Sequence, residues 1–216
     1  MNDDQPPAAG PADAPIPPED VELIEREVCY QGYFRVDRLR LRHRQHAGGH
    51  GAVLDREVFE RGQVCAVLPI DPRRDQVVLI EQFRPGAYAA GWHPWLIECV
   101  AGVIEPGETP ESVARREALE EAGCVIDTLE LVSRYLSSPG ATTETVHLYA
   151  GRADLTRVGG VHGLAHEGED IRVDVVSVEA ALALLDRGAI VNAKTVIALQ
   201  WLRFGYPALK ARWLRA

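Results

Sequence analysis

The chain has 216 residues, of which 25% are charged and 46% hydrophobic, and its formal net charge is −9. This length suits one sizeable core with a small appendage, and the composition is ordinary for a globular protein. The acidic balance argues against a general nucleic-acid binder, so an anionic substrate must be met by local cations and metal. No run of about 18 apolar residues is present, which argues against a transmembrane helix and a membrane partner.

Residues 1–20 predict a disordered tail, because they hold six prolines and neither Lys nor Arg. They also lack the basic start and apolar stretch of a signal peptide. The cysteines stand apart in apolar runs and form no CxxC pair, which predicts reduced core residues. They are Cys29, Cys65, Cys99 and Cys124. These features together predict a cytoplasmic protein.

The next part of the chain predicts strands first and then an alternation of strands and helices. Extended segments at 21–31, 33–44 and 51–62 are polar on one face and predict a small, separate antiparallel sheet. Core-like strands are predicted at 63–71, 76–84, 94–102, 129–137, 143–151 and 171–178. Helices are predicted at 110–122, 178–188 and 192–205. This interleaving predicts a mixed sheet flanked by helices, an α/β (α+β) fold.

The helix predicted at 110–122 carries an unusual acidic face. Glu117, Glu120 and Glu121 are spaced i, i+3 and i+4, which places all three on one face of the helix. Like charges so close to one another repel. A hard divalent cation held by oxygen ligands would offset this repulsion, and magnesium fits best. A solvated acidic surface helix is the alternative explanation for such a cluster considered alone.

Local signals delimit this helix on both sides. Thr109 is a suitable N-cap and Pro110 fits the first helical position. Gly123 suits the left-handed residue that ends a helix. A small-residue stripe at Ala114, Ala118 and Ala122 beside the acidic face predicts close packing against a sheet.

The full pattern resembles the Nudix box, the signature of the Nudix hydrolases. Every polar and glycine position of the box is filled, by Gly102, Glu108, Arg116, Glu117, Glu120, Glu121 and Gly123. The two apolar positions hold Ala118 and Cys124, both smaller than the usual aliphatic residue, a departure that bears on packing. The resemblance implies an α/β/α sandwich with a mixed sheet, and magnesium-dependent cleavage of a diphosphate linked to another group.

Beyond the box, residues from about 21 onward resemble the ADP-ribose pyrophosphatases within this family. The persuasive segments are 59–62, 77–84, 138–144, 162–173 and 191–202. A proline beyond the box tends to accompany ADP-ribose specificity, and Pro139 follows Gly123 by sixteen residues. The resemblance therefore implies hydrolysis of ADP-ribose to AMP and ribose 5-phosphate. It also implies three regions: the tail 1–20, a dimerising strand region 21–62 and a Nudix domain 63–216.

The resemblance also implies roles for individual acidic residues. The implied ligands of two or more Mg²⁺ ions, or of Mn²⁺ as a substitute, are the Ala101 carbonyl, Glu117, Glu120, Glu121 and Glu169. Glu167 is implied as the general base, because a carboxylate on metal is a poor free base and a movable loop suits the task. His162 and His166 are rival bases in the same loop. Glu108 and Arg116 are implied to brace the loop and helix through an ion pair.

Substrate contacts are implied from both subunits of a homodimer. Tyr33, Phe34, Arg56 and Glu57 would come from the partner subunit, with an aromatic ring stacking on adenine. Arg61, Arg84, Val103 and Ser138 would come from the subunit that holds the metal, and Glu144 from the partner's loop. Arginine suits phosphate because its planar fork binds two oxygens at once.

Two other functions remain open from the sequence. One is Nudix hydrolysis of another nucleoside diphosphate sugar or a dinucleotide, such as GDP-mannose or NADH. The other is a regulator that binds ADP-ribose without cleaving it, which would be expected to carry a damaged box. Pro139 and the extended N-terminal strands favour ADP-ribose hydrolysis over the first alternative, and the intact box disfavours the second.

Overall fold

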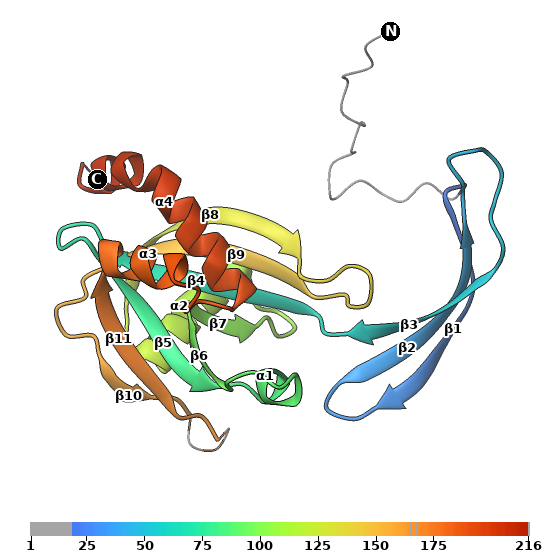
Figure 1. The fold of residues 1–216 in the computed structure, drawn as a ribbon, viewed down its shortest axis with the longest axis horizontal. Coiled ribbons are helices and arrows are strands. Elements are labelled where there is room, and N and C mark those ends of the chain that lie inside the picture. Colours follow the sequence, from blue (N-terminus) through green and yellow to red (C-terminus); the bar gives the residue numbers. More distant parts are fainter. Residues whose placement is uncertain (1–18, 165, 167, 216) are drawn as a thin grey trace, which may run out of the picture. The chain divides into compact units, whose positions relative to one another are not determined.

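A computed structural model describes residues 19–164, 166 and 168–215 (Figure 1). The chain divides into two compact units, residues 1–60 and residues 61–216. The proline-rich segment up to residue 18 lies outside the described residues.

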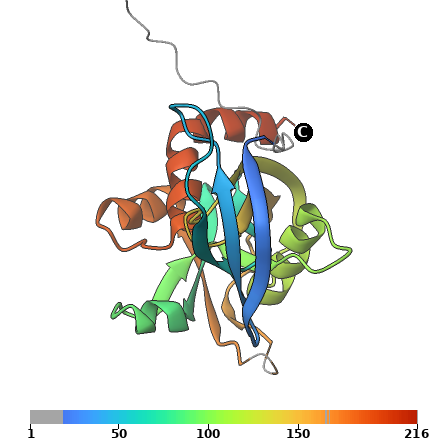
Figure 2. The ribbon, with the colours of Figure 1, turned by 90° about the vertical axis from the view of Figure 1, so that its right-hand side faces the viewer.

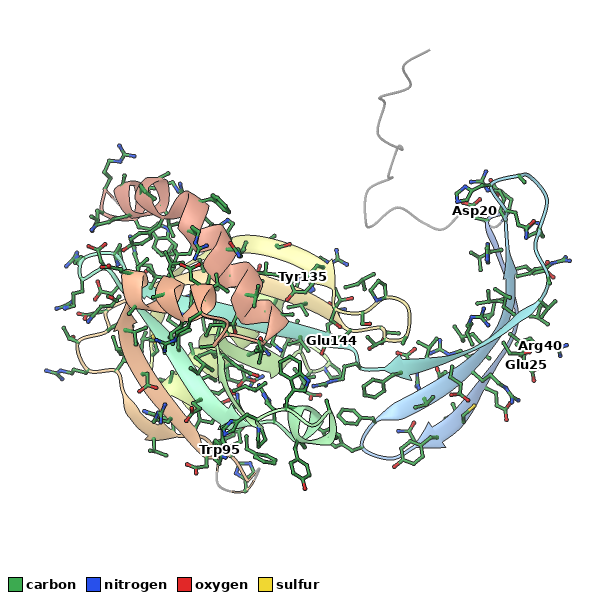
Figure 3. The ribbon with its side chains drawn as sticks, viewed as in Figure 1. Asp20, Glu25, Arg40, Trp95, Tyr135 and Glu144 are labelled. Carbon is green, nitrogen blue, oxygen red and sulfur yellow. The ribbon has the colours of Figure 1, made fainter. Side chains whose placement is uncertain are left out.

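The described part of the first unit is a three-stranded antiparallel sheet in the order β1-β2-β3. Its strands are β1 (Val21–Gln31), β2 (Arg35–His43) and β3 (Leu54–Glu60). Opposite charges face each other across β1 and β2, as at Glu25 and Arg40 (Figure 3). Among described residues 19–60, Asp37 alone is buried, so this sheet has no apolar core of its own.

The second unit is built on an eight-stranded mixed sheet. Its central path runs β10-β11-β5-β4-β9-β8, with β6 paired to β5 and β7 paired to β4. The β4–β9 pair is parallel and the other pairs are antiparallel. The strands are β4 (Gln63–Asp71), β5 (Gln76–Phe83), β6 (Trp95–Glu98), β7 (Val100–Val103), β8 (Ile126–Leu136), β9 (Thr145–Ala153), β10 (Gly160–His162) and β11 (Ile171–Ser177).

Helices cover both faces of this sheet. The helices are α1 (Pro85–Ala89), α2 (Pro110–Ala122), α3 (Val178–Asp186) and α4 (Ala193–Trp213). Along β4, Ala66, Leu68 and Ile70 belong to the core beneath α3 and α4, while Cys65 and Val67 belong to the core beneath α2. Strand side chains alternate between faces, so a strand apolar throughout is buried on both sides. Helices α2 and α4 lie on opposite sides of the sheet (Figure 2). This α/β/α sandwich confirms the predicted fold class.

Two predicted elements differ in extent from the structure. The strand predicted at 94–102 is two strands, β6 and β7, because the N–H of Cys99 turns to Thr195 Oγ1 at 2.8 Å. The last helix continues past Pro207 to Trp213. Leu209 and Trp213 are buried beyond the proline, and their burial offsets the helix hydrogen bond that proline removes.

Two short elements and the position of one cysteine differ from what the sequence predicts. Helix α1 and strand β10 are short and carry no periodic pattern to predict them. Cys29 is exposed on β1, which contradicts the core position predicted for it, whereas Cys65, Cys99 and Cys124 are buried. None of the helices in the described part of the chain combines the length and apolarity needed to cross a bilayer.

Candidate active site

Helix α2 begins and ends as its sequence predicts. Thr109 Oγ1 accepts a hydrogen bond from the N–H of Ser112 at 3.1 Å, and Ser112 Oγ accepts one from the N–H of Thr109 at 3.0 Å. Pro110 occupies the first turn, and Gly123 closes the helix with φ 59°. Ala114, Ala118 and Ala122 are buried against the sheet. The small-residue stripe therefore brings the adjacent acidic face close to the strands.

Arg116 neutralises much of the acidic face. Its Nη1 donates to Glu117 Oε1 at 2.7 Å and to Glu120 Oε2 at 3.0 Å, and its Nε donates to Glu108 Oε1 at 2.9 Å. Glu108 also accepts the N–H of Glu105 at 3.0 Å. The bond from Arg116 lowers the pKa of Glu108, and Glu108 in turn raises the pKa of Arg116. Arg116 thus ties the loop before α2 to the carboxylates on the helix.

Glu121 is the most deeply buried carboxylate of the face, with 3% of its surface exposed. Its Oε2 accepts the main-chain N–H of Ala101 on β7 at 3.1 Å. Burial raises the pKa of Glu121 to about 8, and the charges of Glu117 and Glu169 act in the same direction. Burial also raises the pKa of Glu117. These carboxylates lie close together and are shielded from solvent, so a cation bound there would stabilise their ionised forms.

Gly102 makes room for one of these carboxylates. A Cβ atom built on Gly102 would overlap the carboxylate of Glu117. A side chain at position 102 would therefore force Glu117 to move from its place between β7 and α2. The two neighbours of Gly102 on β7 are Ala101, bonded to Glu121, and Val103.

The loop between β10 and β11 brings further candidate groups toward α2. Glu169 Oε2 accepts the N–H of Leu164 at 3.0 Å, and its charge acts on both Glu117 and Glu121. His162 Nε2 lies 2.9 Å from the Gly159 carbonyl, which engages one of the rival bases. His166 is exposed. Glu167, the predicted general base, lies outside the described residues.

Arg84 brings a cation to the same region from the end of β5. Its Nε and Nη2 both donate to Glu98 Oε2, at 3.1 and 2.7 Å, and its own charge acts on Glu121. Glu98 is 1% exposed, and its Oε1 accepts the side-chain amide of Asn192 at 3.0 Å. The sequence analysis missed Glu98 and Asn192. A charged residue inside the apolar run of 95–100 was the available signal.

The other substrate contacts predicted in the second unit lie on two neighbouring loops. Arg61 Nε is 3.7 Å from Glu144 Oε1, within one chain, and the N–H of Arg61 donates to Thr143 Oγ1 at 3.0 Å. Ser138 and Pro139 form the turn before β9, where the Ser138 carbonyl accepts the N–H of Thr142 at 3.0 Å. Pro139 is therefore a turn residue in this fold, whatever its role toward substrate.

Four of the five contacts predicted for the partner lie in the first unit, and the fifth, Glu144, lies in the second. Tyr33 is 90% exposed at the turn between β1 and β2, and its ring stands edge-on to Phe34. Phe34 also packs edge-on to Phe59, with ring centroids 5.0 Å apart. Arg56 and Glu57 are exposed on β3. The exposure of Tyr33 and Arg56 leaves both available for contact with another molecule.

The donor set suits a hard divalent ion, because carboxylate and carbonyl oxygens are the ligands that Mg²⁺ prefers. Glu117, Glu121 and Glu169 influence one another electrostatically, and Glu121 is buried among them. Among the described residues no three acidic, His or Cys side chains are grouped closely enough to hold one ion as they stand. Glu117 Oε1 accepts a hydrogen bond from Arg116, so one of the two oxygens of this carboxylate is already engaged.

Comparison with known proteins settles the family. The NUDIX domain profile matches residues 60–199, which include α2, the β7 strand and the loop carrying Glu169. The chain belongs to the Nudix family. This confirms the family predicted from the box.

Individual relatives of this Nudix protein are similar over nearly their whole length. An ADP-ribose pyrophosphatase of Escherichia coli strain K12 is 51% identical over 194 residues, covering 90% of this chain and 93% of the relative. One of Haemophilus influenzae is 42% identical over 201 residues, covering 92% and 93%. A GDP-mannose pyrophosphatase of Cronobacter sakazakii is 36% identical over 186 residues, covering 85% and 95%. A solved ADP compounds hydrolase shares the fold, with TM-score 0.67 and 19% identity over 88% of this chain and 96% of that one.

Proposed function

We propose that this Nudix protein hydrolyses the diphosphate of ADP-ribose to AMP and ribose 5-phosphate. The proposal rests on an intact acidic centre with the cation Arg84 beside it. The charges of Glu121 and Glu169 act on Arg84, and the charge of Arg84 acts on Glu121. The 51% identity to an ADP-ribose pyrophosphatase over 90% of the chain supports this substrate above the GDP-mannose of a relative 36% identical.

Magnesium is the proposed cofactor, two or more ions, with Mn²⁺ as a substitute. Glu117, Glu121 and Glu169 would hold it together with the carbonyl of Ala101, and Glu120 would add a further ligand. The ion would neutralise charge on the diphosphate and make a bound water more acidic. Burial raises the pKa of Glu121 to about 8, and the charges of Glu117 and Glu169 add to the rise. This supports the assignment, because a bound cation would stabilise the ionised carboxylates.

The protein's own groups would bind the substrate and move one proton. Arg84 would bind diphosphate oxygens, and Arg61 would contact the substrate from the loop that lies beside Glu144. Glu167 would accept a proton from the attacking water while the second phosphate leaves. Arg116 has a bracing role in this scheme, since its nitrogens are occupied by Glu108, Glu117 and Glu120.

A homodimer is part of the proposal. Strand β1 exposes apolar side chains along its length, namely Val21, Leu23, Ile24, Val28 and Tyr30. A three-stranded sheet without a buried apolar face is marginal in water, so a covering partner would stabilise it. The partner would contribute Tyr33, Phe34, Arg56 and Glu57 to the site. Sedimentation would test this assembly, with Val28→Glu expected to shift dimer toward monomer.

The decisive test is a substrate panel with the full-length protein. We expect Mg²⁺-dependent release of AMP from ADP-ribose, faster than turnover of GDP-mannose or NADH and abolished by chelator. Glu117→Gln should remove activity, while Glu179→Gln, an exposed acid in the first turn of α3, should not. Preference for GDP-mannose or NADH would overturn the substrate assignment. Binding of ADP-ribose without turnover of any compound would instead support a regulator.

A further inference from the structure

We infer that Glu98 and Asn192 are positioning residues, which hold Arg84 in the orientation that grips the substrate diphosphate. This inference rests on the proposed function and extends it, because neither residue touches the acidic centre directly. Both act through hydrogen bonds that end on Arg84.

Arg84 is held along one edge of its guanidinium group. Two of its three guanidinium nitrogens, Nε and Nη2, converge on the single oxygen Oε2 of Glu98, at 3.1 and 2.7 Å. Its Nη1 makes no hydrogen bond within the described part of the chain. The side chain is 35% exposed, whereas that of Glu98 is 1% exposed. One edge of the guanidinium therefore faces the buried carboxylate, and the remaining nitrogen is left for another ligand.

Negative charges surround Arg84 and favour its charged form. Burial lowers the pKa of Arg84, but the hydrogen bonds and charge of Glu98, together with the charges of Glu121 and Glu169, raise it above its ordinary value. Arg84 is thus a permanent cation beside two of the proposed metal ligands. A diphosphate bridged to those carboxylates by metal would bring its oxygens toward this cation, which suits arginine's fixed fork of donors.

Glu98 is itself fixed by the start of helix α4. Its second oxygen, Oε1, accepts the amide Nδ2 of Asn192 at 3.0 Å. Asn192 is the N-cap of α4, and its Oδ1 accepts the N–H of Thr195 at 3.2 Å. Because this Oδ1 is committed as an acceptor, the amide can present only its N–H group to Glu98. Both oxygens of a buried carboxylate are therefore satisfied, as such a group requires.

The same helix end also fixes the strand beside the proposed metal site. Thr195 Oγ1 accepts the N–H of Cys99 at 2.8 Å, at the break between β6 and β7. Cys99 lies two residues before Ala101, whose N–H binds Glu121. The start of α4 thus anchors Arg84 and the Ala101 backbone together. Such rigid support for a binding group is what precise substrate positioning needs.

The donor and acceptor pattern allows a swap experiment. Glu98→Gln alone turns an amide N–H₂ toward the donor of Asn192 or of Arg84. Asn192→Asp alone sets two carboxylates against each other. In the double variant, the amide introduced at position 98 donates to the carboxylate introduced at position 192, and its oxygen still accepts from Arg84. Asp is also a good N-cap, so α4 keeps its start.

We expect each single variant to raise the KM for ADP-ribose about tenfold with little change in kcat, because a lost substrate contact weakens binding before and during the reaction. The double variant should return KM to within about threefold of wild type. Glu130→Gln, which removes the partner of exposed Arg212, is the matched control and should leave KM unchanged. Wild-type turnover is measured alongside, since its absence would reject the proposed function and not the positioning role.

A second measurement is independent of metal and turnover. In nitrogen-15-labelled protein without metal, the Nε–H signal of Arg84, assigned with Arg84→Lys, should exchange slowly with water and do so faster after Glu98→Gln. Slow exchange restored in the double variant would support positioning. The inference would be overturned if the single variants lowered the melting temperature but left KM and the Arg84 signal unchanged, because the network would then serve stability alone.

Discussion

The main-chain N–H of Ala101 donates a hydrogen bond of 3.1 Å to Oε2 of Glu121, joining β7 to the acidic face of α2. This bond stabilises the ionised carboxylate, but burial outweighs it and raises the pKa of Glu121 to about 8. Glu121 therefore takes up a proton more readily in the folded, metal-free protein than in the unfolded chain. Burial of this carboxyl group lowers the free energy of unfolding of the metal-free protein, and it leaves a ligand in place for a cation.

The first prediction concerns pH and Glu121. Its pKa rises from 4.5 to about 8 on folding, so the folded metal-free state binds the extra proton between those values. The free energy of unfolding should therefore fall as pH rises through this window. In chelator at pH 8, Glu121→Gln should melt higher than wild type, by about 2–4 °C for each kcal/mol relieved. Calorimetry at pH 6 and pH 8, with and without Mg²⁺, would measure this.

Magnesium supplies the control for that prediction. It should raise the melting temperature of the wild type at pH 8 and leave Glu121→Gln nearly unchanged, because the variant lacks a charged ligand. Glu179→Gln should behave as wild type throughout. A wild-type protein whose stability in chelator rises between pH 6 and pH 8 would contradict the assigned burial of Glu121.

The second prediction concerns Gly102, whose missing Cβ leaves space for the Glu117 carboxylate. Gly102→Ala should displace that carboxylate without altering any charge, and so weaken Mg²⁺ binding and lower kcat about a hundredfold, the scale of a misplaced catalytic group. Gly205→Ala is the matched control, because a Cβ there meets no atom within 4 Å. Titration with Mg²⁺ followed by calorimetry would separate lost metal affinity from lost folding. Equal Mg²⁺ affinity in the two alanine variants would refute the steric argument.

Helix α2 was predictable because its determinants are local. The N-cap, the closing glycine, the alanine stripe and the acidic spacing all lie within residues 109–123, and each appears as expected. The continuous apolar run of β4 likewise predicted a core strand, here buried on both faces. The family follows from the same segment, since the box combines these local features.

What escaped prediction depends on residues distant in the sequence. The break at Cys99 is caused by Thr195, 96 positions later, and the charge of Glu98 is tolerated because Arg84 and Asn192 reach it. In helix α4, Tyr206 Oη and Lys210 Nζ, on either side of Pro207, bind Asp75, 2.6 and 2.5 Å from its Oδ1. No local pattern encodes such pairings. The role of Glu167 stays a prediction for a related reason, since it rests on the family resemblance alone.

The third prediction concerns Arg116, which binds three carboxylates of the box region. Arg116→Ala should leave those charges to repel and should lower the free energy of unfolding in chelator by about 1 kcal/mol, a value kept small because the side chain is partly exposed. Arg116→Lys should recover less than half of the loss, since a single ammonium cannot replace the fork. Urea unfolding would measure both variants.

Metal should distinguish this role from general packing. Mg²⁺ should narrow the gap between Arg116→Ala and wild type, because the ion takes over the neutralisation that arginine provides. Arg157→Ala, at an exposed position after β9, should cost nothing measurable. A gap that Mg²⁺ leaves unchanged would mean that Arg116 stabilises the loop by contacts other than charge.

The last prediction concerns Asp71 at the end of β4, whose side chain is 2% exposed. It accepts the N–H groups of Arg73 and Leu155, at 2.9 and 3.3 Å, and Nη1 of Arg74 at 2.8 Å. Burial alone would raise the pKa of Asp71, but these hydrogen bonds together lower it. The unfolded chain therefore takes up the proton first as pH falls. The stabilisation is complete above the ordinary value of 3.8 and is lost as pH drops below it.

Asp71→Asn should cost about 1–3 kcal/mol at pH 7, because its amide turns N–H groups toward donors in a buried place. The difference from wild type should shrink as pH falls below 4, since wild-type Asp71 then also carries a proton. Asp186→Asn, at an exposed side chain bonded to Arg203, serves as the control and should change little. Turnover per folded molecule should stay at the wild-type level, because Asp71 is at the end of β4 away from β7. A difference that persists unchanged into acid would show that the charge of Asp71 does not stabilise this turn.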